Sequence, residues 1–514
     1  MTGPVVGQWE RFEIALKREV PYTDRGSPTS SMGQCGPVDP GDPYYGVTLD
    51  VTYTRPDGTT VDFWGFYDGG TTWRLRYMPD QTGTWHYRAR FSDRTNGVEG
   101  AFTCVPSDVP GMLSVDETNP VWFGFRDGGH LMVRSLHVGD AFFAANFPDV
   151  DRRTFLDWAE GQGYNLLSVA SHYLNRDAAG RGRGWETPRL WPLDAREFRK
   201  LERIMDELAA RHMMLFPFAG FFGRDADHPR DPVEQEAYIR YVLARLGPYW
   251  NLLLNVAGPE PLLPNHPFMT PAEVERLGRM IKSLDVFDHP LTVHNPTGGD
   301  AFKGATWTDF GTLQGPKTSD WRELRAGLRA NHHPHKPLYA QETLWSGNKY
   351  HPDYSDDELR CNAYVLLLSA AAINFADNGG PIDGELGDSS SGFSGTMDLR
   401  DRRQRRHDIL RRAWDCLGTL PFYRMTPRDD LTDGGICLAE EGAHYLVYLP
   451  EGGSVDVAVA GGPALYRVEW INPRAPVERV LGGTTGDGQA LQAPDASQDW
   501  LVYLRAEAEV PGNI

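Results

Sequence analysis

The sequence has little cysteine and a deficit of positive charge. Five cysteines are scattered over 514 residues and form no CxxC pair, which favours reduced packing residues over a disulfide framework or a zinc site. Lysine and arginine number 51 against 70 aspartates and glutamates, for a net charge of −19. Because such a charge repels phosphate backbones and anionic lipid headgroups, we expect neither nucleic acid nor a membrane surface as a partner.

Long apolar runs and targeting signals are also missing. The longest apolar stretch, residues 365–373, includes Ser369 and is far shorter than the roughly 18 residues that span a bilayer. Residues 1–20 have neither the basic and apolar regions nor the small-residue cleavage site of a secretory signal. We therefore expect a cytoplasmic protein without a membrane span.

The motifs that bind nucleotides or activate a serine are absent as well. No glycine spacing matches a dinucleotide or P-loop fingerprint, and the segment around Ser394 lacks the spacing of a nucleophile elbow. His332, His333 and His335 lie close together, but they precede a predicted strand and lack helical i, i+4 spacing. We therefore expect no cofactor and no metal, and a small or neutral molecule as the partner.

Glycine and proline are abundant, with 55 and 38 residues, and predict many turns. Within residues 1–115, apolar and polar positions alternate in short runs at 47–53, 61–64, 72–77 and 84–91. This period of two predicts an N-terminal β-sandwich of immunoglobulin-like size. Similar runs at 443–449, 455–459, 466–470 and 500–504 predict a second β-sandwich over residues 421–514.

Residues 116–420 have a different rhythm, in which apolar strands alternate with helical stretches. We expect eight strands, at residues 131–136, 164–170, 213–218, 251–256, 291–294, 305–310, 337–342 and 371–376. Helical patterns lie between most of them, at 151–161, 194–211, 232–246, 271–284, 355–368 and 400–417. The sequence thus predicts an α/β fold, a central (β/α)₈ TIM barrel flanked by the two β-sandwiches.

Catalytic and binding groups of such a barrel stand where its strands end. The polar and aromatic residues at these positions are our candidates for substrate binding: His137, His172, Asn255, His294, Asn295, Trp307, Asp309, Gln341, Trp345, Asp377 and Asn378. For each histidine, a hydrogen-bonded structural role is the alternative.

Two glutamates among the strand ends are candidates for catalysis. Glu260 follows the fourth strand and Glu342 ends the seventh, so we expect them on opposite sides of one barrel mouth. Glycoside hydrolysis needs such a pair, because a protonated carboxyl donates to the leaving oxygen while an ionised one attacks the anomeric carbon or activates water. Donors such as Arg134, His294 or the region of Gln341 should surround the ionised Glu342, and Asp309 is the alternative acid.

Several motifs, taken in order, resemble one group of proteins. They are residues 80–87 (DQTGTWHY), 119–124 (NPVWFG), 134–137 (RSLH), 336–342 (KPLYAQE) and 391–395 (SGFSG). Together they resemble the glycoside hydrolase clan whose (β/α)₈ barrel carries catalytic glutamates on strands four and seven. Within that clan the chain is most similar to apiosidase-like barrels, which often carry an N-terminal immunoglobulin-like domain and a C-terminal β-sandwich.

The resemblance implies a retaining double displacement with Glu342 as nucleophile and Glu260 as acid/base. One position departs from the clan, since many members have asparagine directly before the acid/base and this chain has Pro259. Asn255 or Asn295 is a candidate for the missing amide.

We therefore expect a retaining glycoside hydrolase that acts in exo fashion on a short glycan or glycoside, with carbohydrate as its partner. A non-catalytic glycan-binding protein with a decayed barrel is the first alternative, and a transglycosylase or sugar lyase that uses the same pocket is the second. A homo-oligomer is compatible with the sequence, which leaves the oligomeric state open.

Overall fold

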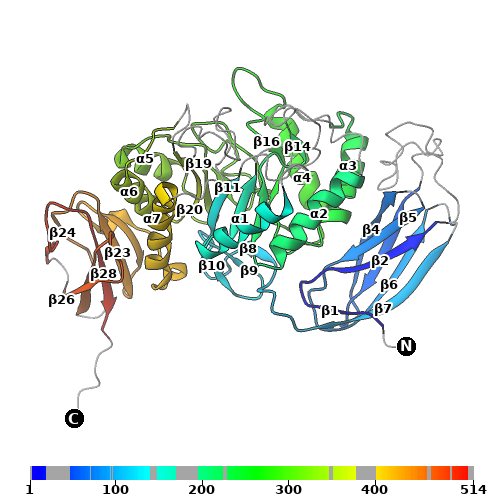
Figure 1. Cartoon of the computed structure of the whole chain (residues 1–514), viewed down its shortest axis with the longest axis horizontal. Helices are drawn as coiled ribbons and strands as arrows, with labels where there is room; N and C mark the ends of the chain where they lie inside the picture. Colours follow the sequence, from blue (N-terminus) through cyan, green and yellow to red (C-terminus); the bar gives the residue numbers. More distant parts are fainter. Residues whose placement is uncertain are drawn as a thin grey trace, which may run out of the picture.

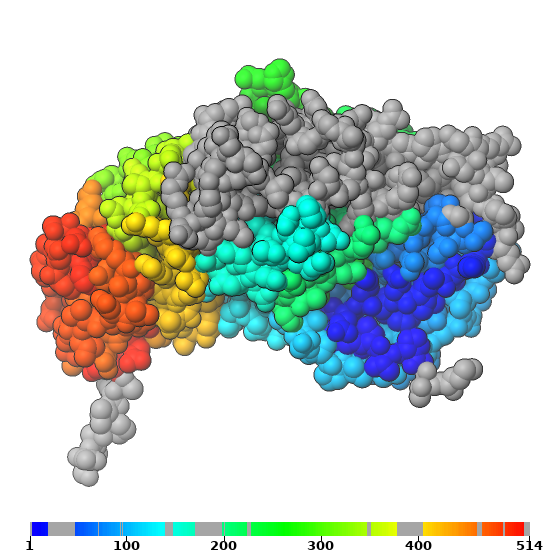
Figure 2. Space-filling model, viewed as in Figure 1, coloured from blue at the N-terminus to red at the C-terminus, as the bar shows by residue number. Residues whose placement is uncertain are grey.

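The computed structural model describes residues 3–18, 47–69, 71–92, 94, 96–138, 148–169, 195–223, 228–346, 351–377, 401–459, 465–486 and 489–507. Three units follow one another along the long axis of the molecule (Figure 1). An all-β unit from the N-terminal part lies at one end, a mixed α/β unit in the middle and a second all-β unit at the other end. Figure 2 shows that the three units form one continuous elongated body.

The N-terminal unit is a seven-stranded sheet folded into two layers, with strand order β1-β7-β6-β3-β4-β5-β2. Its strands are β1 (Val5–Gly7), β2 (Phe12–Lys17), β3 (Leu49–Thr54), β4 (Thr60–Gly69), β5 (Thr72–Tyr77), β6 (Gly83–Phe91) and β7 (Gly97–Val105). Along β6, buried Trp85, Tyr87 and Ala89 alternate with exposed His86 and Arg88, as the period of two predicted. The long β4 pairs with β3 through its first half and with β5 through its second, which joins the layers.

A small antiparallel sheet connects this unit to the middle of the chain. It consists of β8 (Leu113–Val115), β9 (Phe123–Phe125) and β10 (His130–Leu131). The ring of Phe123 lies 5.4 Å from that of Phe310, just before a strand of the central unit. The small sheet therefore packs against the amino ends of the central strands.

The central unit is built on parallel strands that curl into a rounded array. Six of them pair in the order β13-β12-β11-β20-β19-β18: β11 (Arg134–Val138), β12 (Leu166–Val169), β13 (Met214–Pro217), β18 (Gly311–Thr312), β19 (Leu338–Ser346) and β20 (Ala371–Asp377). Four shorter strands form the parallel pairs β14-β16 and β15-β17: β14 (Phe222–Gly223), β15 (Leu254–Asn255), β16 (Ala257–Gly258) and β17 (Leu291–Thr292).

Backbone hydrogen bonds link these short strands to both ends of the six-stranded sheet. The amide of Leu253 donates to the carbonyl of Leu215 at 3.0 Å, next to β13. On the other side, the amide of Asp309 donates to Leu291 O at 2.8 Å, which connects β17 with the segment that leads into β18. The array therefore turns back on itself, and its strand ends converge.

Helices cover the outside of this array (Figure 1): α1 (Asp149–Gly161), α2 (Ala195–Ala209), α3 (Pro232–Leu246), α4 (Pro271–Leu284), α5 (Trp321–Asn331), α6 (Asp356–Leu367) and α7 (Asp401–Gly418). Capping boxes begin α4, through Thr270 and Glu273, and α6, through Ser355 and Glu358. Both helices begin within one residue of the positions expected from the sequence, and these local capping interactions explain where they begin. Among the described residues, no helix is long and apolar enough to cross a membrane.

The C-terminal unit is a six-stranded antiparallel sheet, in the order β21-β22-β23-β28-β25-β26, with the separate pair β24-β27. Its strands are β21 (Thr426–Pro427), β22 (Ile436–Glu440), β23 (His444–Leu449), β24 (Ser454–Val455), β25 (Tyr466–Ile471), β26 (Arg479–Thr485), β27 (Leu491–Gln492) and β28 (Trp500–Ala506). One face of the sheet has its own apolar core. The other face contributes Leu446, Tyr448 and Leu501 to the large core shared with the central unit.

A buried ion network ties the N-terminal unit to the helices of the central unit. Arg245 of α3 is 0 % exposed and donates to Asp68 of β4 at 2.8 Å and to Glu202 of α2 at 2.5 Å. Arg76 of β5 donates to the same Glu202 oxygen at 2.7 Å. Two buried carboxylates and two arginines from both units therefore depend on one another for charge compensation.

Replacing Arg245 tests this network. Arg245→Met should lower the free energy of unfolding by about 3–5 kcal/mol, because Asp68 and Glu202 would lose the guanidinium that compensates their buried charges. Urea and thermal unfolding measure the loss. As the matched control, Arg88→Met removes an exposed partner of Glu99, with 61 % and 57 % side-chain exposure, and should cost less than about 1 kcal/mol. Equal losses in the two variants would contradict the assignment.

Candidate active site

Glu342 is a buried carboxylate surrounded by polar groups from neighbouring strand ends. It lies in β19 and is 3 % exposed. Its Oε1 lies 3.1 Å from Gln314 Nε2 and 3.3 Å from His294 Nε2, and its Oε2 lies 3.4 Å from Lys317 Nζ. The polar groups that contact the Glu342 carboxylate of β19 therefore come from residues that follow β17 and β18 in the sequence.

These surroundings keep Glu342 charged. Burial by itself raises the pKa of a carboxyl, but the polar contact with His294 and the positive charge of Lys317 outweigh it and lower the pKa of Glu342 from 4.5 to about 2. The His351 imidazole contacts the backbone carbonyl of Glu342 through Nε2 at 2.6 Å, and burial together with Lys317 lowers the pKa of His351 to about 4. Glu342 is therefore an ionised carboxylate beside a neutral imidazole at neutral pH.

The turn that contains Glu260 packs directly against His294. At Gly258, two residues earlier, a Cβ atom would lie 2.0 Å from Phe218 O and 3.0 Å from His294 Cβ, so only glycine allows this approach. Glu260 itself is partly exposed and has a φ of 48°, in the left-handed region that non-glycine residues rarely adopt. The structure therefore brings the Glu260 turn and the Glu342 carboxylate to the same residue, His294.

Aromatic side chains line the same region. The rings of His137 and Trp345 stack with centroids 4.3 Å apart, and the ring of Phe218 meets His294 edge-on at 5.0 Å. Trp345 is fully buried beneath this contact. It therefore supports His137 and does not present an open face for stacking.

Four buried polar atoms here have no hydrogen-bond partner among the described residues. They are Asn255 Oδ1, His294 Nδ1, Gln341 Oε1 and Trp345 Nε1. The other ends of two of these side chains are held, since Asn255 donates to Phe218 O and Gln341 donates to Ser168 Oγ at 3.0 Å. Because buried polar atoms are nearly always paired, unpaired donors and acceptors near a charged carboxylate indicate a place for a ligand.

Two further candidates are engaged in local structure. Asn295 donates to Asp300 Oδ1 at 2.9 Å and accepts from the amide of Ala301 at 3.1 Å, so its amide closes the 295–301 loop. Asp377, at the end of β20, accepts from Arg406 of α7 at 3.1 Å. His172 and Asn378 lie outside the described residues.

The structure places Trp307 and Asp309 away from Glu342. Trp307 Nε1 donates to Glu275 of α4 at 2.5 Å, and its ring packs over Gly278 of the same helix. Asp309 Oδ2 lies 3.0 Å from Lys282 Nζ, near the end of α4, and also accepts from the amide of Leu291. Asp309 therefore precedes β18, at the end of the array opposite to Glu342, and cannot supply the alternative acid.

Trp307 and Asp309 were expected in the site because the sixth strand was predicted several residues too early. The sixth strand was expected at residues 305–310, but this segment contains a turn at 306–307 and a bend at 309–310, and β18 spans Gly311–Thr312. The amide of Glu342 donates to Leu313 O at 3.1 Å, so the strand continues until Gln314 reaches the carboxylate. Sequence reasoning missed Gln314 and Lys317, although Gln314 follows the run Phe310-Gly-Thr-Leu313 directly, which was a readable signal.

Arg134 is a further correction, because it is not a neighbour of Glu342. It begins β11, and its guanidinium pairs with Asp415 of α7 at 2.7 Å. A residue at the start of a parallel strand lies at the amino end of the array, whereas His294, which follows β17, lies at the carboxyl end. Arg134 therefore does not contact Glu342, whereas His294, the other histidine or arginine expected there, does.

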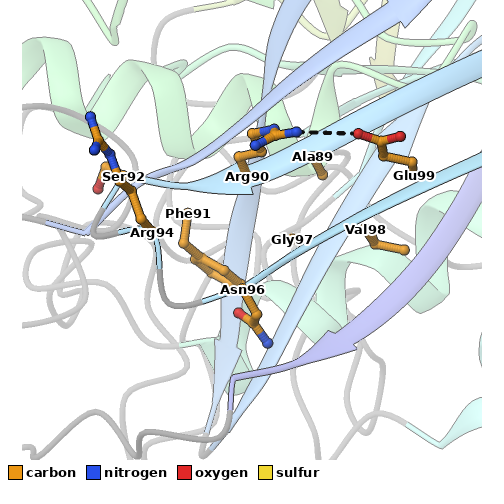
Figure 3. A pocket seen from close by; sticks show the side chains of 9 residues that line it. All are labelled: Ala89, Arg90, Phe91, Ser92, Arg94, Asn96, Gly97, Val98 and Glu99. Atoms are coloured by element: carbon orange, nitrogen blue, oxygen red, sulfur yellow. Dashed lines mark hydrogen bonds and ion pairs between the residues drawn. The ribbon is translucent and has the colours of Figure 1, made fainter.

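A separate hollow of about 630 Å³ lies on the N-terminal unit, over the hairpin of β6 and β7 (Figure 3). Arg90 and Glu99 bridge its two strands at 3.3 Å, and Phe91 and Asn96 lie toward the turn. None of its lining residues contacts the neighbours of Glu342 named above. We treat it as a surface feature of that sheet.

Comparisons with known proteins found one family match and several similar structures. Residues 5–92 match a family described as a domain of unknown function (DUF5060). A provisionally assigned glycoside hydrolase structure from Bacteroides vulgatus has a TM-score of 0.70 and 18 % identity, over 98 % of this chain and 100 % of that one. A family 5 glycoside hydrolase from the same species has a TM-score of 0.58 and 15 % identity, over 78 % and 94 % of the two chains.

Another structure, named only as a glycoside hydrolase, has a TM-score of 0.58 and 15 % identity, over 78 % of this chain and 99 % of its own. No curated protein matches the chain. At these identities the likeness is one of fold. The chain therefore shares its fold with structures of glycoside hydrolases.

The charge on Glu342 should be visible in the pH dependence of stability. Its folded pKa lies below the usual 4.5, so its stabilising charge is fully present above about pH 4.5 and is lost as the pH falls toward 2. The stability difference between wild type and Glu342→Gln should stay constant from about pH 7 to 5. Below that range it should shrink by an amount on the order of 3 kcal/mol.

Melting temperatures of both proteins across the pH range measure this difference. Glu451→Gln, which removes an exposed carboxylate with 63 % side-chain exposure, is the control and should behave like wild type throughout. A difference that stays constant down to pH 2, or that grows as the pH falls, would show that Glu342 has no lowered pKa.

Proposed function

We propose that the central unit is a (β/α)₈ barrel and that the chain is a retaining glycoside hydrolase, with Glu342 as nucleophile and Glu260 as acid/base. The observation that carries this proposal is the buried Glu342 carboxylate, whose pKa of about 2 leaves it ionised and ready to attack. The fold shared with glycoside hydrolase structures supports it.

In the first step, a Glu342 oxygen forms a bond to the anomeric carbon while the bond from that carbon to the leaving oxygen breaks. The Glu260 carboxyl gives its proton to the leaving oxygen. In the second step, Glu260 takes a proton from water, whose oxygen attacks the same carbon and releases Glu342. Lys317 and Gln314 favour the ionised form of Glu342 at the start and at the end of this cycle.

A carbohydrate suits the unpaired buried atoms beside this pair. Asn255 Oδ1 and Gln341 Oε1 are acceptors, whereas Trp345 Nε1 is a donor. A sugar hydroxyl both donates and accepts, so a site that offers both kinds of atom fits a hydroxyl-rich ligand better than an anion, which only accepts. Exo-action on a short glycan and a cytoplasmic location are parts of the proposal that rest on the sequence alone.

One observation favours a non-catalytic glycan-binding protein as the second candidate. Pro259 replaces the asparagine that many clan members have before the acid/base, and Glu260 has a left-handed backbone. In that case the site would bind glycans without turnover, and substitution of either glutamate would change only affinity.

Turnover of aryl glycosides with good and poor leaving groups separates the two candidates. Glu342→Ala should abolish turnover of both kinds of substrate. Glu260→Ala should lower it by about 10²–10⁴-fold for poor leaving groups and by much less for dinitrophenyl glycosides, which need no protonation. Azide should rescue the Glu260 variant and give a glycosyl azide of retained configuration.

Glu323→Ala, an exposed position on α5, is the control and should keep wild-type activity. Unchanged turnover in both glutamate variants would refute the catalytic assignment. Tight binding of glycans by a wild-type protein that releases no product would favour the second candidate.

A further inference from the structure

Gln314 bridges His294 and Glu342 with a single amide nitrogen. Its Nε2 lies 2.8 Å from His294 Nε2 and 3.1 Å from Glu342 Oε1. Its Oε1 lies 2.9 Å from Thr297 Oγ1. Gln314 is 5 % exposed and His294 is 0 % exposed, so these contacts are shielded from water.

The charge on Glu342 decides which way this amide points. An ionised carboxylate can only accept, and Lys317 on its other oxygen favours the ionised form. The Gln314 atom that faces Glu342 must therefore be the NH₂ group. The carbonyl oxygen then faces the Thr297 hydroxyl, which can donate to it.

The amide in turn decides where His294 carries its proton. An NH₂ group has two N–H bonds, and with one directed at Glu342 the other is available for His294 Nε2 at 2.8 Å. With a proton on His294 Nε2, two N–H donors, one from His294 and one from Gln314, would face each other across 2.8 Å without an acceptor. The amide therefore favours a bare Nε2, with the ring proton on Nδ1. In this arrangement the donors that hold the Glu342 carboxylate in its ionised form are Gln314 and Lys317, not His294.

This leaves an N–H group with no acceptor in the described parts of the chain. His294 Nδ1 is buried and has no hydrogen-bond partner there. An unpaired buried donor destabilises the folded protein, and a bound ligand that accepts from it would remove this penalty. The Cβ atom of His294 also lies against Gly258, two residues before Glu260, so this side chain stands next to both glutamate segments.

We infer that Gln314 is a positioning residue that fixes the Nδ1–H tautomer of His294, and that His294 donates this N–H to an oxygen of the bound sugar. The assignment of the tautomer rests on contacts within the protein alone. The donation to a sugar oxygen rests on the proposed function. Different measurements test the two parts.

Selective ¹⁵N labelling of histidine tests the tautomer without any substrate. Long-range ¹H–¹⁵N correlation spectra at neutral pH distinguish Nδ1–H from Nε2–H imidazoles, and His294→Asn identifies the His294 signals by their loss. Wild type should show the neutral Nδ1–H form. Gln314→Glu, which replaces the donor by an acceptor, should convert His294 to a form with a proton on Nε2.

Gln235→Glu is the matched control, because Gln235 is also buried but lies on α3 and should leave the His294 signals unchanged. A proton on His294 Nε2 in the wild-type spectrum would overturn the inference, and this result does not depend on whether any variant folds. An unchanged tautomer in a folded Gln314→Glu variant would overturn it as well.

Kinetics on a hydrolysed aryl glycoside tests the donation to the sugar. His294→Phe keeps a ring but removes the donor, and kcat/KM should fall about 2–10-fold, as expected for one neutral hydrogen bond. Substrates that lack one sugar hydroxyl should be compared in wild type and in the His294→Phe variant. Removal of the hydroxyl that His294 contacts should lower kcat/KM in wild type but cause no further loss in the variant. If the loss of kcat/KM from the variant and the loss from each missing hydroxyl add at every sugar position, His294 does not contact the sugar. The NMR spectra would still decide the tautomer.

Discussion

An ionised carboxylate in a nearly dry interior is the constraint on which this site depends. Glu342 can stay charged only if donors and a cation surround it, because burial by itself favours the neutral acid. Those groups come from His294 after β17 and from Gln314 and Lys317 after β18. Three neighbouring strands must therefore end at the same level, and the curled parallel array provides this arrangement.

The same kind of constraint joins the three units. Arg245 of the central unit compensates Asp68 of the N-terminal unit, and Arg360 of α6 binds both oxygens of Asp499, next to β28, at 3.0 and 3.1 Å. Buried ion pairs add little net stability, but they are costly to break and tolerate few geometries. They therefore fix the orientation of the flanking sheets against the outer helices, and the shared apolar core supplies the stability.

Local patterns predicted much of the fold and part of the site. The alternation in β6 and the helical patterns of α4 and α6 depend on neighbours in the chain, so sequence reasoning found these elements. The strand before Gln314 was missed because Trp307 and Phe310 look like parts of one apolar run, whereas Trp307 packs outward on α4. That shift of a few residues put Asp309 in the predicted site and left out Gln314 and Lys317.

The sequence by itself determined the succession of β, α/β and β segments and placed Glu260 and Glu342 after apolar strands, because periodicity and turn residues act over short distances along the chain. Only the tertiary structure decided that His294 lies next to both glutamate segments, that Gln314 bridges it to Glu342, and that Arg134 and Asp309 lie at the far end of the strands. These contacts join residues of separate strand ends, such as Gln314 and Glu342, which are 28 positions apart in the sequence. Their geometry depends on strand register and curvature, which no local pattern encodes.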